Sequence, residues 1–231
     1  MASFDCPKCD HTQTVSDSHI GKRTKCPKCG EQGIVTESAT PNMHDLADSP
    51  LSENIVVLRQ SGGPIRTPLS HSIVLNKESS LEREFITVID KTLPAGLTGC
   101  YGITTVYEPE TDYTSGQYVY ASRFAVKALE EIRAFETRFL IFNVWGRHVQ
   151  TLSAAEIADV SAGATRQCDS KWMLYDENEA CEHYASIAYL ATIRTASGQV
   201  LETNISPVLA EAKKFSSKFS ADDLDPKPRS K

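Results

Sequence analysis

The chain has 231 residues, 40% of them hydrophobic and 23% charged, with a formal net charge of −6. That composition fits one mid-sized soluble domain with a small appendage, or two small domains, and the acidic balance argues against a protein built mainly to coat nucleic acid. No run approaches the roughly 18 apolar residues of a membrane span. The N-terminus, MASFDCPKCD, lacks the basic and apolar regions of a secretory signal, so we expect a cytoplasmic protein with no membrane partner.

The tetrapeptide CPKC occurs twice near the N-terminus, at residues 6–9 and 26–29. The resulting pattern, C-x2-C-x16-C-x2-C, falls within the spacing of four-thiolate zinc sites. Two cysteines with two residues between them can turn both sulfurs toward one point, and two such turns supply a tetrahedron about 2.3 Å from the metal. The sequence therefore predicts one structural Zn²⁺ with a closed coordination sphere made by Cys6, Cys9, Cys26 and Cys29.

The residues around the cysteines agree with a small metal-dependent module. Gly30 follows the second pair, where a turn often needs a positive φ, and short strands are expected at 13–15, 23–25 and 33–35. About 35 residues cannot bury much of a core. Metal ligation would then provide most of the folding free energy, on the order of 10 kcal/mol.

Other chemistry for these cysteines stays open at this point. Each C-x-x-C pair could be a redox dithiol, although that motif belongs between a strand and a helix, a setting that neither pair has. Four thiolates also bind iron, so the sequence alone does not separate zinc from iron. His11 and His19 are alternative ligands. Because four cysteines in register already complete the site, we expect both histidines to lie in exposed loops.

Residues 3–36 resemble a family of short bacterial N-terminal zinc ribbons. The family pattern is C-P-x-C, then A/I-G-K-x-x-K/R, then C-P-x-C-G, and the matching segments here are CPKC at 6–9, IGKRTK at 20–25 and CPKCG at 26–30. The resemblance implies zinc binding by the same four cysteines. It implies little about function, because such ribbons are attached to many different proteins.

Basic residues cluster at 22–28, which gives an alternative function: a nucleic-acid-associated regulator that uses this segment. Nucleic-acid affinity depends on neutralising several phosphates at once. The side chains of residues 1–30 sum to +2, however, and a zinc ion with four thiolates adds −2. Phe4 is the one aromatic residue there that could stack on a base.

Residues 37–54 are polar, contain two prolines and have no apolar period, so we expect a flexible linker. From residue 55 the sequence becomes typical of β-structure, with turn-forming residues between apolar runs. A bulge is expected within 118–129, because its apolar residues do not keep one parity. The expected strands lie at 55–58, 72–75, 85–89, 97–107, 118–129, 132–145, 149–152, 171–175, 187–194 and 200–203.

Two helices and a tail complete the predicted elements. Ser153 with Glu156 forms a capping-box pattern, which predicts a short helix over 153–160. Ser206 and Pro207 are expected to open a last helix, whose apolar face would pack on the sheet. Residues 221–231, ADDLDPKPRSK, are expected to be disordered.

Many strands, few helices and hairpin-like connections predict a mainly β protein: a zinc ribbon at 1–36 tethered to an antiparallel β-sandwich-like domain at 55–220 with a C-terminal helix. The stretch FLIFNVWG at 139–146 also resembles a strand-to-turn signature of small immunoglobulin-like accessory domains. That resemblance implies the same fold class.

The larger domain lacks the sequence motifs of common enzymes, including G-x-S-x-G, G-x-G-x-x-G and H-E-x-x-H. Its best local constellation is Cys181-Glu182-His183, which could be a thiol nucleophile, a second metal site or a polar strand start. Cys100 and Cys168 are interpreted as single buried or half-buried thiols. We predict a non-enzymatic zinc-binding adaptor whose sandwich binds a protein partner, for example along a strand edge. An enzyme with a site assembled from distant residues is a third hypothesis.

Overall fold

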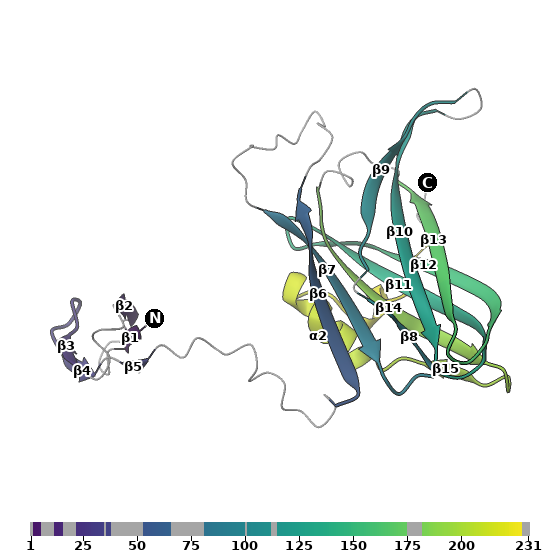
Figure 1. The fold of residues 1–231 in the computed structure, drawn as a ribbon. Helices are drawn as coiled ribbons and strands as arrows, with labels where there is room; N and C mark the ends of the chain where they lie inside the picture. Colours follow the sequence, from purple (N-terminus) through teal and green to yellow (C-terminus); the bar gives the residue numbers. More distant parts are fainter. Residues whose placement is uncertain are drawn as a thin grey trace. The chain divides into compact units, whose positions relative to one another are not determined.

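A computed structural model describes residues 2–5, 12–15, 22–34, 36–37, 53–65, 81–99, 101–111, 115–174 and 182–227 (Figure 1). The chain forms two compact units, Met1–Ser52 and Glu53–Lys231. No helix within the described ranges has the length and hydropathy to cross a membrane.

The N-terminal unit contains two small antiparallel sheets. One has the strand order β2-β1-β5, and the other is the hairpin β3-β4. The short strands predicted from the sequence are confirmed within one residue at β2, β3 and β4. The predicted end of the module at residue 36 is wrong, because Glu37 still pairs with Ala2; residues 38–52 of the expected linker lie outside the described ranges. The strands are β1 (Ala2–Asp5), β2 (Thr12–Val15), β3 (Arg23–Lys25), β4 (Gln32–Ile34) and β5 (Thr36–Glu37).

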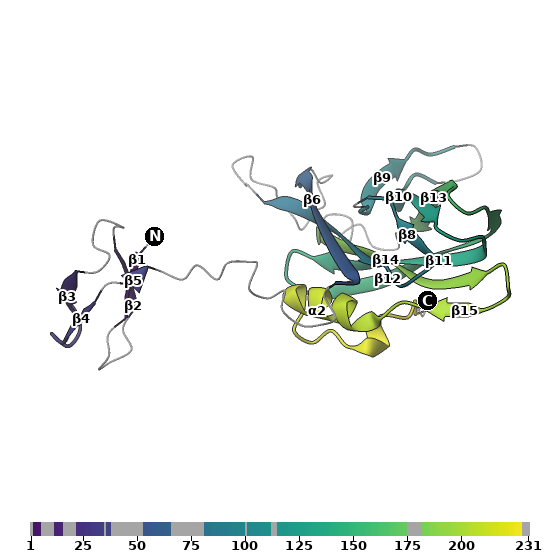
Figure 2. The ribbon, with the colours of Figure 1, turned by 60° about the horizontal axis from the view of Figure 1, so that its bottom comes forward.

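The larger unit consists of two sheets and the helix α2, which confirms the predicted mainly β class (Figures 1 and 2). A six-stranded sheet has the order β12-β11-β14-β7-β6, with β15 also paired to β14. A four-stranded sheet has the order β13-β10-β8, with β9 also paired to β10. The elements are β6 (Ile55–Pro64), β7 (Glu82–Asp90), β8 (Ala95–Leu97), β9 (Thr104–Glu108), β10 (Gln117–Ala128), β11 (Ile132–Asn143), β12 (His148–Val160), β13 (Thr165–Met173), β14 (His183–Thr195), β15 (Val200–Glu202) and α2 (Ile205–Phe215).

The main core lies between the two sheets. Alternation along β11 turns Phe135, Phe139 and Ile141 toward the four-stranded sheet, where Phe124 of β10 meets them. The rings of Phe124 and Phe139 contact edge to face with their centroids 5.5 Å apart. Fully burying a side chain of this size contributes roughly 1.5–3 kcal/mol, so this layer accounts for much of the stability of the unit.

A second core lies on the other face of the six-stranded sheet, under α2 (Figure 2). Val208 and Ala212 of the helix are fully buried against this face, with Leu209 and Phe215 beside them, as the helical spacing predicts. The helix begins earlier than predicted, because Asn204 rather than Ser206 is its cap: Asn204 Oδ1 accepts a hydrogen bond from the Ser206 amide at 3.1 Å.

The helix predicted over 153–160 is wrong, because this segment continues β12 as an edge strand on β11. The side chains that suggested a capping box bond across strands instead. Ser153 Oγ donates to Glu136 Oε1 at 2.6 Å, and Glu156 accepts from Arg166 of β13 at 2.7 Å. Thirteen residues of strand pairing outweigh a local helix signal.

Two finer predictions about the sheets are also wrong. The sandwich is not purely antiparallel, because β14 pairs with β7 in parallel from Ala185 to Tyr189. The expected bulge in β10 is absent from its pairing with β13, which runs in continuous register from Val119 to Lys127. The departure from parity in β10 reflects apolar side chains on its outer face as well as its inner face.

The disordered tail predicted to begin at residue 221 is wrong for 221–227. Ala221–Asp223 forms a 3-10 turn, and the side chain of Leu224 is 4% exposed within the second core. Thr151 Oγ1 donates to the Asp223 carbonyl at 2.5 Å, and Arg138 Nη1 donates to Asp225 Oδ1 at 2.7 Å. The segment 221–227 is therefore part of the fold, and we call it the C-terminal strap.

The strap predicts an asymmetry between two leucine truncations. Leu224→Ala should lower the free energy of unfolding by about 2–4 kcal/mol, because it opens a cavity in the second core. Leu129→Ala should cost less than about 0.5 kcal/mol, because Leu129 is 61% exposed at the turn between β10 and β11. Urea unfolding followed by circular dichroism measures both. If both substitutions changed the free energy of unfolding by the same small amount, residues 221–227 would not pack on the fold and the predicted disordered tail would be correct.

Candidate functional site

The second CPKC segment is a tight turn at the tip of the β3-β4 hairpin. The Cys26 amide donates to the Glu31 carbonyl at 2.8 Å, and the Gly30 amide donates to the Cys26 carbonyl at 2.9 Å. Gly30 has a φ of 75°, a conformation that glycine adopts without a steric penalty. The turn thus brings both ends of the CPKCG segment together.

This turn aims a backbone donor at a sulfur. The Lys28 amide donates to Cys26 Sγ at 3.4 Å, and Cys26 is only 2% exposed. Thiolate sulfur is the form of cysteine that binds metal. Cys29 lies three residues on and is exposed. The geometry fits one half of a four-thiolate site.

The other half of the predicted site, Cys6 and Cys9, lies outside the described residues, as do His11 and His19. Among the residues that the structure describes, no three histidine, cysteine, aspartate or glutamate side chains group as metal ligands. The joining of the two thiol turns by one ion therefore stays a prediction.

Within the Cys181-Glu182-His183 constellation, the structure separates Glu182 from His183. Cys181 is outside the described residues. Glu182 Oε2 accepts from Asn143 Nδ2 at 3.0 Å, whereas the His183 side chain is fully buried between the sheets. His183 is the first residue of β14, as expected for a polar strand start, but a register shift between Phe142 and Asn143 turns its side chain inward.

His183 is an unusual buried base. Its ring meets the Tyr120 ring edge to face at 5.6 Å, and neither ring nitrogen has a hydrogen-bonding partner. Burial, with a further contribution from the charge of Arg83, lowers the pKa of His183 to about 3. The imidazole is thus neutral at physiological pH, and the two unpaired nitrogens cost stability.

The other single thiols and histidines give no reactive group in the described ranges. Cys168 is buried as predicted, and burial raises the pKa of its thiol to about 11, which leaves it unreactive. His148 shares a hydrogen bond of 3.1 Å with Thr151 Oγ1 and packs on Phe219. Cys100 and His71 lie outside the described residues.

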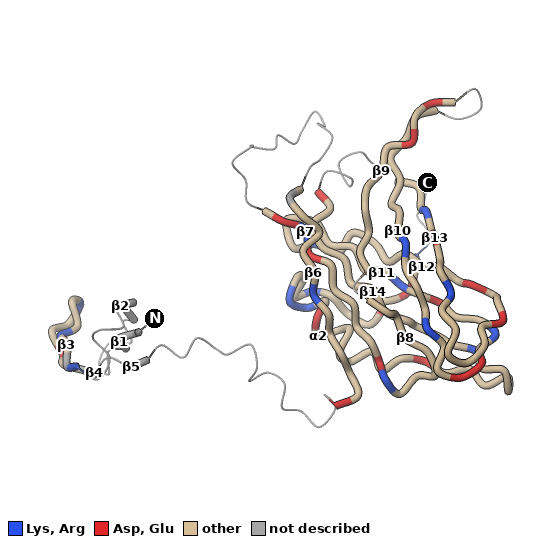
Figure 3. The backbone as a smooth tube through the Cα atoms, viewed as in Figure 1, with Lys and Arg blue, Asp and Glu red and all other residues tan. Residues whose placement is uncertain are grey.

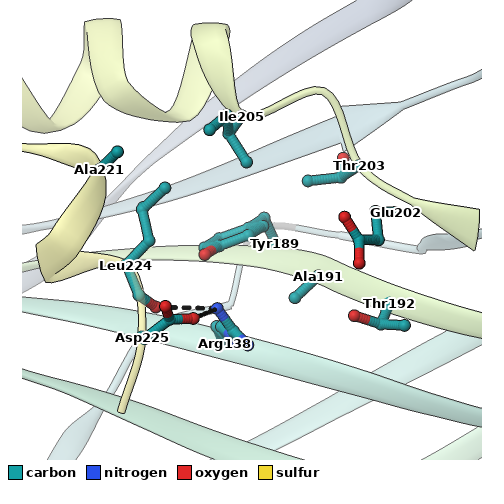
Figure 4. Close-up of a pocket in the computed structure, with 10 residues that line it drawn as sticks. All are labelled: Arg138, Tyr189, Ala191, Thr192, Glu202, Thr203, Ile205, Ala221, Leu224 and Asp225. Atoms are coloured by element: carbon teal, nitrogen blue, oxygen red, sulfur yellow. Dashed lines mark hydrogen bonds and ion pairs between the residues drawn. The ribbon is translucent and has the colours of Figure 1, made fainter. Parts of the chain in front are cut away.

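A cavity that the sequence did not indicate lies beside the C-terminal strap (Figure 4). It has a volume of about 330 Å³ and is lined by residues of β11, β14, β15, the start of α2 and the strap. Arg138, Tyr189 and Glu202 bring polar groups to it from three different strands, and Asp225 of the strap adds a carboxylate. No local motif could have revealed a site assembled in this way.

The buried imidazole predicts a specific loss of stability in acid. Because the pKa of His183 is lower in the folded chain than its ordinary 6.5, the unfolded chain binds more protons between about pH 6.5 and 3. Stability should therefore fall as the pH drops through that window, by up to about 1.4 kcal/mol per pH unit from this group. His183→Leu should remove that slope while leaving stability at pH 7 unchanged or higher.

Urea unfolding at several pH values measures the difference between the two proteins, which separates His183 from the carboxylates that titrate in the same range. His148→Gln is the matched control and should retain most of the slope, since Asp223 and a backbone contact partly offset the burial of His148. NMR titration of the wild-type rings gives a second readout if the leucine variant does not fold. An imidazole that protonates near pH 6.5 would contradict the account.

Comparisons with known proteins give no family. No family model matches the chain, and no curated protein matches it. Among solved structures, the chain is similar to a hypothetical protein from Peptoclostridium difficile 630, with a TM-score of 0.38 and 9% sequence identity. The match covers 57% of this chain and 96% of that one, and at this TM-score it carries no argument about fold or function.

Proposed function

We propose that the chain is a zinc-binding adaptor of the cytoplasm, with a structural Zn²⁺ in the N-terminal unit and a β-sandwich that binds a protein partner. The observation that carries the zinc proposal is the turn at Cys26, where a backbone amide points at the sulfur and Gly30 takes the required positive φ. Cys6, Cys9, Cys26 and Cys29 would hold the ion. Four protein ligands leave no position for water or substrate, so its role would be to stabilise the fold.

Nucleic acid is the second candidate partner of the N-terminal unit. Lys22, Lys25 and Lys28 are all exposed around the thiol turn, where phosphates could reach them. The four thiolates with one zinc offset much of that charge. In the described part of the larger unit, basic and acidic residues alternate along the chain rather than gathering on one strand, which does not favour a nucleic-acid partner there (Figure 3).

A protein partner has a candidate surface on the outer face of the four-stranded sheet. Val106 of β9 and Met173 of β13 flank Val119 of β10 in one row, because each pairs directly with it. Val106 is 42% exposed and Met173 53% exposed, whereas Val119 between them is 2% exposed, so the two outer side chains are the ones that could contact another protein. This row supports the adaptor proposal.

The zinc proposal predicts the metal content of the purified chain. Wild-type protein should contain one zinc per chain, and Cys26→Ser should retain less than about a fifth of it, because three thiolates bind zinc far more weakly than four at a structural site. Cys168→Ser is the control and should keep full zinc content, since Cys168 lies in the core of the larger unit. Elemental analysis by mass spectrometry measures all three.

Each outcome of that measurement separates one alternative. Iron in place of zinc would correct the identity of the ion while keeping the site. Wild-type protein without any metal, or a Cys26→Ser variant with the same content, would overturn the site itself.

The partner proposal predicts that charge in the apolar row abolishes capture of proteins from an extract of the source cells. Val106→Asp with Met173→Asp should lose partners that the wild-type chain retains, because a carboxylate opposite an apolar surface is desolvated without compensation. Thr165→Asp with Gln167→Asp adds the same charge to exposed positions of β13 and should lose none. Identical captured sets for the wild type and the Val106/Met173 variant would remove this row as the contact surface.

A further inference from the structure

The cavity beside the C-terminal strap has the form of a small-ligand site. Its floor is the face of β14, its two ends are the strap and the β15 end, and the start of α2 covers it. In Figure 4, Leu224 and Asp225 lie on one side of Tyr189, and Glu202 and Thr203 on the other. A volume of about 330 Å³ accommodates a compact organic molecule.

The charges around the cavity favour a cation. Arg138 is already engaged: its Nε and Nη2 donate to the Glu136 carboxylate at 3.0 and 3.3 Å, and its Nη1 donates to Asp225 and to the Leu224 carbonyl at 2.7 and 3.1 Å. The three carboxylates of Glu136, Asp225 and Glu202 and the one guanidinium of Arg138 give this region a net charge of −2. Glu202 is exposed, and within the described structure its carboxylate has no hydrogen bond or ion pair, although its backbone pairs with Thr192.

Tyr189 supplies an unsatisfied polar group to the same space. Its side chain is 1% exposed, and its hydroxyl has no hydrogen-bonding partner. The Arg138 guanidinium lies near enough to the hydroxyl for a weak polar contact, but no hydrogen bond of normal geometry joins them, because Arg138 is already bonded to Glu136, Asp225 and the Leu224 carbonyl. Burial raises the pKa of Tyr189 to about 12, so the group is a neutral phenol whose oxygen can accept a donor. An unpaired buried hydroxyl costs stability until a ligand or water meets it.

The remaining walls are apolar. Ala191 lies on the floor, Ile205 above it and Leu224 at the strap end (Figure 4). Methylene groups would contact these side chains, and the Tyr189 ring would attract a cation placed beside it. The cavity therefore combines a net negative charge, a phenol oxygen and short aliphatic walls.

We propose that this cavity binds the ammonium group of a small aliphatic amine. The Glu202 carboxylate would pair with the ammonium, the Tyr189 oxygen would accept one of its hydrogens, and Ile205, Leu224 and Ala191 would pack on the aliphatic chain. The C-terminal strap forms one wall, so its place in the fold is part of the site. This inference is independent of the zinc proposal, because no residue of the N-terminal unit takes part.

The direct test compares two ligands that differ in charge. The full chain, labelled with ¹⁵N, is titrated with n-butylammonium chloride and, separately, with n-butanol. The ammonium should shift amides of residues 189–192, 202–205 and 221–225 in a saturable way, with a Kd of about 1 mM, as expected for a ligand with few heavy atoms. Butanol should bind at least tenfold more weakly. Equal affinity for the two, or no saturation by the ammonium, would overturn the proposal.

Three variants then assign the contacts. Glu202→Gln should weaken butylammonium binding about tenfold, because it removes the charge at the mouth with little change of shape. Tyr189→Phe should weaken binding a few-fold without lowering stability, since it removes an unpaired hydroxyl and keeps the ring. Glu130→Gln, at an exposed turn away from the cavity, is the matched control and should change nothing. Unchanged binding in Glu202→Gln, or equal losses in all three, would contradict a specific site.

Discussion

The larger unit depends on the burial of its central strands on both faces. β11 and β14 pair along their length, and each turns one set of side chains toward the four-stranded sheet and the other set toward α2. Phe139 and Phe142 of β11 belong to different cores, yet both are fully buried. One pair of strands therefore fixes the positions of the second sheet, the helix and the C-terminal strap. A unit of this size can bury enough apolar surface in this way to fold without a metal ion.

The N-terminal unit has no comparable source of stability. Its described strands are two to four residues long, and its hairpin β3-β4 ends in a turn that holds Cys26 by backbone bonds. Strands so short, in so small a module, do not make an independently stable core. If zinc binds as proposed, the energy comes from metal–thiolate bonds, and the two units differ in what keeps them folded.

The sequence predicted elements wherever one local signal agreed with the tertiary environment. The strand at β11 and the apolar face of α2 follow from their periods, and the thiol turn follows from the CPKCG letters. The helix at 153–160 failed because Ser153 and Glu156 satisfy a local capping rule but find stronger partners across the sheet. The prediction of a disordered tail failed for 221–227 because a single apolar residue, Leu224, lies among acidic residues there and gives no apolar periodicity.

The candidate sites also differ in whether their residues are close together in the sequence. Four cysteines in two identical motifs carry their chemistry in their spacing, so the sequence alone is enough to propose a zinc site, which stays a prediction. The inward turn of His183 depends on a register shift between strands, and the cavity depends on the return of the strap to β14. Neither leaves a pattern in the residues nearby, because each is created by contacts between distant segments.

Hydrogen–deuterium exchange of the full chain, with and without a metal chelator, tests the central claim most directly. We expect that removing the metal abolishes protection of backbone amides in residues 2–37 and leaves residues 53–227 unchanged, since the two cores of the larger unit need no ion. Protection at 2–37 that survives removal of all metal would contradict that claim.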